Sequence, residues 1–171
     1  MWQFVLSTGV FTTRPRQDMG EVHVKACLAK RFDPVWSINP AVDYGIANLK
    51  VLEGKGYKLD GLNDLDKAKL MYLMHHEGEG QGPNFVGNTL NADRLRSVFR
   101  LQTKKDGEWI ERAKGNVADG YRAWFADYVD TKFRGATKEY FCPEKPAVIS
   151  ADLTKILVAI GGKEIPDVKT P

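Results

Sequence analysis

Apolar residues recur at helical spacing through the middle of the chain, and residues 62–82 carry the clearest pattern. Asn63 or Asp64 can cap the first turn, and Asp66 adds negative charge where a helix N-terminus favours it. The positions that follow are good helix formers and are apolar on nearly every side, which predicts a helix buried at the centre of a domain. They form two stripes, one of Leu65, Ala68 and Tyr72 and one of Leu70, Leu73 and Met74. Glycines at 78, 80 and 82 and a proline at 83 predict that this helix ends after residue 77.

The same spacing predicts helices over residues 21–32, 41–52, 92–102, 117–133 and 151–160, with a further helical stretch from Trp109. Residues 1–13 fit a strand or an irregular segment. Asp33-Pro34 and Asn39-Pro40 are expected to break helices, because a residue before proline avoids helical geometry. Residues 84–91 are expected to hold a small turn or hairpin. In the helix over 92–102, the side chains expected to point inward are Leu95, Val98 and Phe99. Together, these expected elements predict a mostly helical domain with little sheet.

Composition narrows the class of protein. At 171 residues the chain is long enough for one hydrophobic core and short for two full domains. Its 25 basic and 22 acidic residues give a net charge of +3, which suits an anionic polymer such as a bacterial wall. There is no long basic run and no aromatic-basic signature of an RNA-binding sheet, so a nucleic-acid partner is not expected.

Neither a membrane span nor a secretory signal is expected. No apolar run approaches the roughly 20 residues that cross a bilayer. The opening segment WQFVL has no basic region before it and no small-residue cleavage site after it. Cys27 and Cys142 permit one disulfide without requiring it.

Glu77 is the first candidate for chemistry. It follows Leu70, Leu73 and Met74 by seven, four and three residues, so it projects from their apolar face at the helix end. Partial desolvation there would favour the neutral, proton-bearing carboxyl that a general acid needs. Glycines beyond it let a substrate approach the backbone. The alternative is an ordinary surface glutamate at a helix end, and both interpretations stay open.

His75 and His76 invite a metal site with Glu77 and Glu79. Adjacent helical side chains point about 100° apart, so two neighbouring histidines do not easily hold one ion. No HExxH spacing exists. We therefore expect neither a metal nor a cofactor. One histidine is expected to pack, while the other lines the site or faces water.

An acid of this kind needs a second polar group to orient water or to stabilise a developing cation. The nearby candidates are Glu79, Thr89 and Asp93. Each has an ordinary explanation as a loop charge, a turn residue or a first-turn acid, but one of the three is expected to face Glu77. The segment GEGQGP lacks the lysine of a phosphate loop, and no serine lies in a nucleophile elbow. The aromatic positions of 117–133 are more typical of a core than of a sugar platform, although Tyr121 and Arg122 can edge a cleft.

Three segments carry a resemblance to a known family. They are GKGYKLDGLNDLDKAKLMYLMHHEGEG, FVGNTLNADRLRSVFRLQ and GYRAWFADYVDTKF, within residues 51–142. Together they resemble the lysozyme-like domain at the C-terminus of bacterial type VI secretion effectors and some spike proteins. They are similar, more distantly, to pesticin-type and phage-type lysozymes. The most specific piece is LMYLMHHEG.

The resemblance implies an α+β, mostly helical, lysozyme-like fold with a buried central helix, and muramidase activity on the MurNAc-GlcNAc bond of peptidoglycan. It implies Glu77 as the general acid, with Thr89 and Asp93 matching the threonine and aspartate of pesticin-like members. Phage-type members place an aspartate about nine residues after the glutamate, where this chain has Val86. The expected substrate-binding residues are His76, Gly78, Gly80, Tyr121 and Arg122. The expected organisation is an N-terminal segment over 1–36, a catalytic domain over 37–142 and a tail over 143–171 with one helix.

Delivery without a signal peptide into the periplasm of a target cell, and an immunity protein that blocks the site, also follow from the resemblance. Two alternatives come from other classes of protein. One is a peptidoglycan- or glycan-binding module of a delivered spike protein, without catalysis. The other is a helical protein-interaction domain in which Glu77 is structural.

Overall fold

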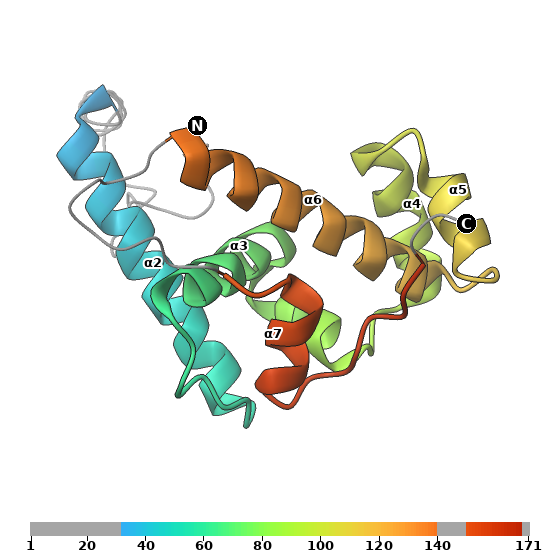
Figure 1. The fold of residues 1–171 in the computed structure, drawn as a ribbon, viewed down its shortest axis with the longest axis horizontal. Helices are drawn as coiled ribbons and strands as arrows, with labels where there is room; N and C mark the ends of the chain where they lie inside the picture. The colour runs from blue at the N-terminus through green and yellow to red at the C-terminus, as the bar shows by residue number, and fades with distance from the viewer. Residues whose placement is uncertain (1–31, 140–149, 169–171) are drawn as a thin grey trace, which may run out of the picture. The chain divides into compact units, whose positions relative to one another are not determined.

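The computed structural model describes residues 32–139 and 150–168, which form six helices (Figure 1). These are α2 (Pro34–Gly54), α3 (Asp64–Gly87), α4 (Ala92–Gln102), α5 (Asp106–Arg112), α6 (Val117–Glu139) and α7 (Leu153–Ala159). The prediction of a mostly helical protein is confirmed. Within these ranges there is no strand, so the β part of the expected α+β class is not confirmed, and residues 88–91 form a turn. The expected element over 1–13, the expected helix over 21–32 except its last residue, and Cys27 and Cys142 lie outside the described residues.

The chain divides into two compact units, Met1–Asn48 and Leu49–Pro171, and the division falls inside α2. We expected a boundary at residue 36 and a separate tail from residue 143. In the first unit α2 begins at Pro34, where proline suits the first helical position, and the Asp33 carboxylate accepts a hydrogen bond of 3.0 Å from the Val35 backbone. The expected break at Pro40 is wrong, because α2 continues through it.

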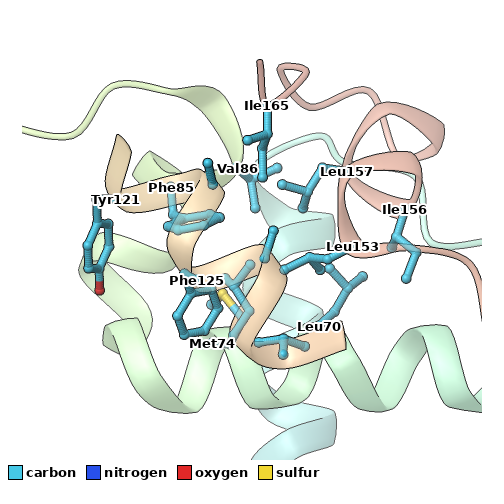
Figure 2. Close-up of a cluster of buried hydrophobic side chains, with 14 of the residues drawn as sticks. Leu70, Met74, Phe85, Val86, Tyr121, Phe125, Leu153, Ile156, Leu157 and Ile165 are labelled. Atoms are coloured by element: carbon cyan, nitrogen blue, oxygen red, sulfur yellow. The ribbon is translucent and has the colours of Figure 1, made fainter. Parts of the chain in front are cut away.

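The second unit is organised around α6, which packs against α3, α4, α5 and α7. Figure 1 shows α4 and α5 at the Val117 end of α6. Fully buried apolar side chains from both halves of α3, from α6 and from α7 meet in one core (Figure 2), to which the residues after α7 add Ile165. The described part of the expected tail, residues 150–168, therefore contributes to this core. In α4, Leu95 and Phe99 are buried as predicted, whereas Val98 is exposed.

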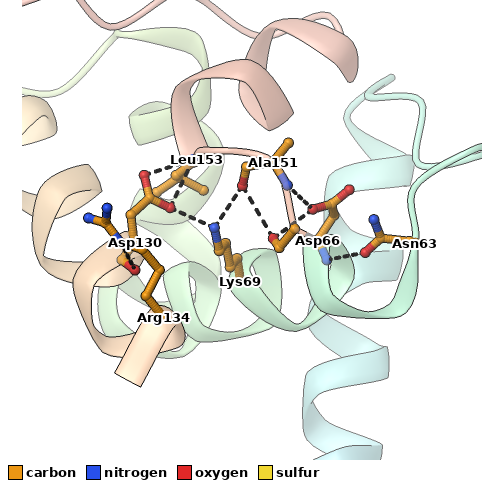
Figure 3. Close-up of polar contacts among 8 residues, drawn as sticks. Asn63, Asp66, Lys69, Asp130, Arg134, Ala151 and Leu153 are labelled. Carbon is orange, nitrogen blue, oxygen red and sulfur yellow. Dashed lines mark hydrogen bonds and ion pairs between the residues drawn. The ribbon is translucent and has the colours of Figure 1, made fainter. Parts of the chain in front are cut away.

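A buried polar network fixes the start of α7 against α3 and α6 (Figure 3). Lys69 of α3 donates from Nζ to Asp130 Oδ1 of α6 at 2.7 Å and to the Ala151 carbonyl at 2.7 Å. The Asp130 carboxylate also accepts the Leu153 N–H, at 3.1 Å to each oxygen, and so satisfies the first turn of α7. Asp66 Oδ1 accepts the Ala151 N–H at 3.0 Å. Because these charges are paired and hydrogen-bonded, their burial is tolerated.

In the part of the chain that the structure describes, no helix combines the length and the apolarity that crossing a membrane requires.

Candidate functional site

The site forms where α3 bends. Asn63 caps this helix, accepting the Asp66 N–H at 2.9 Å, as predicted. At Gly78 the backbone leaves helical geometry, with φ +76° and ψ 165°. The helix then resumes and ends at Asn88, which adopts the left-handed conformation. The first part of the helix therefore stops at Gly78, next to the predicted end. The prediction that the later glycines and Pro83 keep the chain out of a helix is wrong, because the helix resumes and runs through them.

The second part of α3 folds back onto the first. A Cβ at Gly82 would collide with the Met74 sulfur and lie 3.6 Å from the Met74 Cα, although residues eight apart in a straight helix are separated by about 12 Å. Burial of Phe85 and Val86 at 0% exposure explains why this glycine-rich segment stays helical, since tertiary packing outweighs poor propensity. The bend leaves Glu77 as the last residue of the first part.

The Glu77 carboxyl is nearly enclosed, with 7% of its side chain exposed. The Tyr121 hydroxyl of α6 donates a hydrogen bond of 2.6 Å to Glu77 Oε1. His76 Nδ1 lies 3.0 Å from the same oxygen. Among the described residues, no hydrogen bond reaches Glu77 Oε2. One carboxyl oxygen therefore has two polar neighbours, and no hydrogen bond from the described residues fixes the other.

Tyr121 is itself fixed by packing. Its side chain is 1% exposed, and its ring meets Phe85 and Phe99 edge to face at centroid distances of 6.1 and 5.2 Å. Figure 2 shows it at one edge of the core, beside Phe85 and Phe125. Burial raises the pKa of the Tyr121 hydroxyl, and the charge of Glu77 and its hydrogen bond raise it further. The hydroxyl therefore keeps its proton at neutral pH and acts as the donor to Glu77.

The two histidines diverge, as adjacent helical side chains must. His76 packs its ring 4.7 Å from that of Phe125 and contacts Glu77. His75 is exposed, and partial burial together with the neighbouring His76 lowers its pKa. Among the described residues, no group of three or more His, Cys, Asp or Glu side chains is placed to hold a metal ion.

The three candidates for a second polar group all lie at the surface. Glu79 is exposed just after the bend, and Asp93 is exposed in the first turn of α4. The Thr89 hydroxyl donates to Asn84 Oδ1 at 3.2 Å in the turn after α3. Within the described ranges, none of the three has a hydrogen bond or ion pair with Glu77. Gly80, also exposed, is helical.

Arg122 is buried and hydrogen-bonded to backbone carbonyls, which the sequence did not indicate. Its side chain is 0% exposed and donates to the carbonyls of Phe85 at 2.9 Å, Lys163 at 2.5 Å and Glu164 at 3.1 Å. Burial lowers its pKa to about 10, with Asp119 opposing the shift, so the guanidinium stays charged at neutral pH. We therefore leave Arg122 out of the substrate-binding residues.

The sequence did not predict the hydrogen bond between Tyr121 and Glu77 either. It suggested only that Tyr121 lies at the edge of a cleft. The two residues are 44 positions apart, and no local pattern links them. The available signal was that Tyr121 opens the aromatic face of the strongest helix after the Glu77 helix.

Replacing Gly78 by alanine is expected to lower the free energy of unfolding by about 1–3 kcal/mol, because its backbone region is essentially restricted to glycine. A Cβ added at either Gly78 or Gly80 would meet no atom within 4 Å, so a steric clash does not contribute to the expected change in stability. Gly80→Ala is the matched control. Its helical backbone should leave stability unchanged or raise it by up to about 1 kcal/mol. Urea unfolding followed by circular dichroism measures both, and equal effects would contradict the strain at Gly78.

Tyr121→Phe is expected to lower the free energy of unfolding by roughly 1–3 kcal/mol, because it leaves a nearly enclosed carboxyl without its closest donor while keeping the ring. Tyr57→Phe is the control, since it removes a longer hydrogen bond of 3.3 Å to the Pro83 carbonyl. We expect a loss of about 0.5–1 kcal/mol there. An equal or smaller loss for Tyr121→Phe in urea unfolding would show that the bond to Glu77 does not hold in solution.

Comparisons of the chain with known protein families, with curated proteins and with solved structures give no match.

Proposed function

We propose that the protein is a peptidoglycan hydrolase of the lysozyme-like, muramidase type, which cleaves the MurNAc-GlcNAc bond with Glu77 as general acid. The observation that carries the proposal is the Glu77 carboxyl, 7% exposed and held through a single oxygen by Tyr121 and His76. A general acid needs a positioned carboxyl that can hold a proton in a partly water-excluded place. The segments that resemble lysozyme-like domains supply the substrate class.

The hydrogen bonds at Oε1 suit proton donation from Oε2. When the proton passes to the glycosidic oxygen, the C–O bond breaks and the sugar left behind carries oxocarbenium-like charge. The carboxyl becomes a carboxylate at the same moment. Hydrogen bonds to an ionised acceptor are stronger than those to a neutral one, so the Tyr121 hydroxyl stabilises the donor more as the proton leaves.

Water completes the reaction by adding its oxygen to the anomeric carbon and giving up one proton, which returns Glu77 to its acid form directly or by way of solvent. We propose that Glu79, Thr89 or Asp93 orients this water or balances the positive charge. The anomeric form of the first product decides between retention and inversion. In glycosidases, two catalytic carboxyl groups about 5–5.5 Å apart indicate retention, and a separation of roughly 6.5–9.5 Å indicates inversion.

The same proposal extends to the setting in which the enzyme acts. The resemblance to type VI secretion effectors supports delivery without a signal peptide and an antibacterial action in the periplasm of a target cell. The partners in this proposal are the glycan strands and an immunity protein that covers Glu77. The mild positive charge of +3 is compatible with an anionic wall.

The test is the chemistry of the new chain ends. Purified peptidoglycan is digested with wild-type protein and with Glu77→Gln, reduced with borohydride and analysed by mass spectrometry of the muropeptides. A muramidase leaves reduced N-acetylmuramic acid at each new end in the wild-type sample. Reduced N-acetylglucosamine would show that the other glycosidic bond is cleaved. Sedimentation of the protein with peptidoglycan without any new reducing end would favour the glycan-binding module instead.

A further inference from the structure

The aromatic side chains around the site separate into two groups. Tyr121 and Phe125 are buried and belong to the core. Three others, Tyr72 of α3 and Trp124 and Tyr128 of α6, are only partly buried and are named here the aromatic ledge. From the sequence alone, a core role was the better explanation for all of them. The three ledge side chains pack against the core with part of their surface and leave the rest exposed, so core packing does not account for all of that surface.

In the ledge, the Trp124 and Tyr128 rings stack, and the Tyr72 ring is tilted against that of Tyr128. Tyr128 is the middle ring, with its centroid 5.9 Å from that of Trp124 at 25° between planes, and 6.4 Å from that of Tyr72 at 33°. Rings at such small angles turn their flat faces in nearly the same direction. The Tyr72 and Tyr128 side chains each carry a polar hydroxyl, which this otherwise apolar surface gains.

The ledge is continuous with the Glu77 site on both helices. On α3, Tyr72 stacks with His76 at 6.5 Å and 29°, and His76 contacts Glu77. On α6, Trp124 lies 5.6 Å from Tyr121, whose hydroxyl holds Glu77. From Tyr121 to Tyr128 the helix rises about 10 Å, a length comparable to a disaccharide. A cation lies beside the middle ring, because Lys132 Nζ lies 5.6 Å from the centre of the Tyr128 ring.

We infer that the aromatic ledge is a glycan subsite, on which sugar rings of the strand next to the scissile bond lie flat. This inference rests on the proposed function and names where that substrate is held. The C–H face of a pyranose packs on an aromatic ring by dispersion and removal of water, while its hydroxyls reach phenol groups at the edge. Binding sites combine such aromatic surface with a few polar groups. The Lys132 ammonium suits the carboxylates of the stem peptides.

The experiment measures glycan binding without turnover. Soluble, uncross-linked glycan oligomers carrying stem peptides are titrated into Glu77→Gln protein by calorimetry. Tyr128→Leu and Trp124→Leu are then added singly to that protein. Each removes a flat ring but keeps an apolar side chain, and we expect about 10-fold weaker binding for each. Tyr128→Phe keeps the ring and should restore the affinity to within about threefold. Trp109→Leu is the matched control, because Trp109 is partly buried on α5 and is not part of the ledge.

A second measurement covers the case in which a leucine variant does not fold, which circular dichroism will reveal. Tryptophan fluorescence of Glu77→Gln should change on addition of the oligomers, and Trp124→Phe should abolish the change. An unchanged Kd in folded ledge variants, or an unchanged fluorescence response in Trp124→Phe, overturns the inference. The hydrolase proposal then still stands on the reducing ends formed by the wild type. If the wild type forms no reducing ends, the hydrolase proposal fails, and the binding data still decide on the ledge.

Discussion

Glu77→Gln is expected to lower the rate of peptidoglycan hydrolysis by about 10²–10⁴, the usual contribution of a general acid. Glutamine matches glutamate in shape, and its carbonyl oxygen can still accept the hydrogen bond of the Tyr121 hydroxyl. It has no acidic proton for the glycosidic oxygen. The loss should therefore fall on kcat, with substrate affinity retained, in an assay that counts reducing ends.

The control for this variant is Glu111→Gln, which removes one negative charge from an exposed position on α5. It should hydrolyse at the wild-type rate, because the change in net charge is the same and the position is remote from the bend of α3. Both proteins should show the circular dichroism spectrum of the wild type. Turbidity clearance by Glu77→Gln at the parental speed would remove Glu77 from the chemistry.

Lys69→Met is expected to lower the free energy of unfolding by about 3–5 kcal/mol, a large part of the stability of a domain of this size. Lys69 and Asp130 lie 2.7 Å apart, with only 4% and 12% of their side chains exposed. Methionine replaces the stem of the lysine but leaves the Asp130 carboxylate buried without its cation. The Ala151 carbonyl also loses its donor. Urea unfolding measures the change.

Lys155→Met is the control, because Lys155 is exposed on α7. A surface substitution of this kind should change stability by no more than about 0.5 kcal/mol. The double variant Lys69→Met/Asp130→Asn tests the mechanism. Asparagine removes the buried charge yet can still accept the Leu153 N–H, so part of the lost stability should return. If the double variant is less stable than Lys69→Met, the unpaired charge is not the cause of the loss.

The helices could be predicted where one periodic apolar face decides the structure. The helix over 92–102 was predicted with the bounds that α4 has, and Asn91 caps it, accepting the Arg94 N–H at 3.0 Å. The strong aromatic repeat of 117–133 likewise identified α6, which begins at Val117 as predicted and continues to Glu139.

The course of the chain could not be predicted where tertiary packing overrides local preference. Pro40 and Pro83 were interpreted as breaks, and both lie within helices. Of Gly78, Gly80 and Gly82, Gly78 alone takes a non-helical backbone conformation, and nothing in the spacing of these glycines distinguishes it from the other two. The difference comes from Phe85 and Val86, which reach the core only if the chain bends once and then stays helical.

The candidate site was predictable in its central residue and not in its surroundings. The apolar face before Glu77 predicted a carboxyl shielded from water, and 7% exposure of its side chain agrees with that prediction. The Tyr121 hydrogen bond to this carboxyl, and the buried contacts of Lys69 and Asp66, join residues that are 44 to 85 positions apart. Sequence periodicity carries no information about such pairs. The second polar group remains a prediction.

The hydrogen bonds from Arg122 to the carbonyls of Lys163 and Glu164 have a practical consequence for shortened versions of this protein. A truncation after Gly162 would remove two of the three carbonyls that accept hydrogen bonds from the buried Arg122 side chain. It would also expose the rest of the core where Ile165 and Val168 are buried. Expression versions should therefore retain the chain through Val168, and an affinity tag at that end needs a spacer.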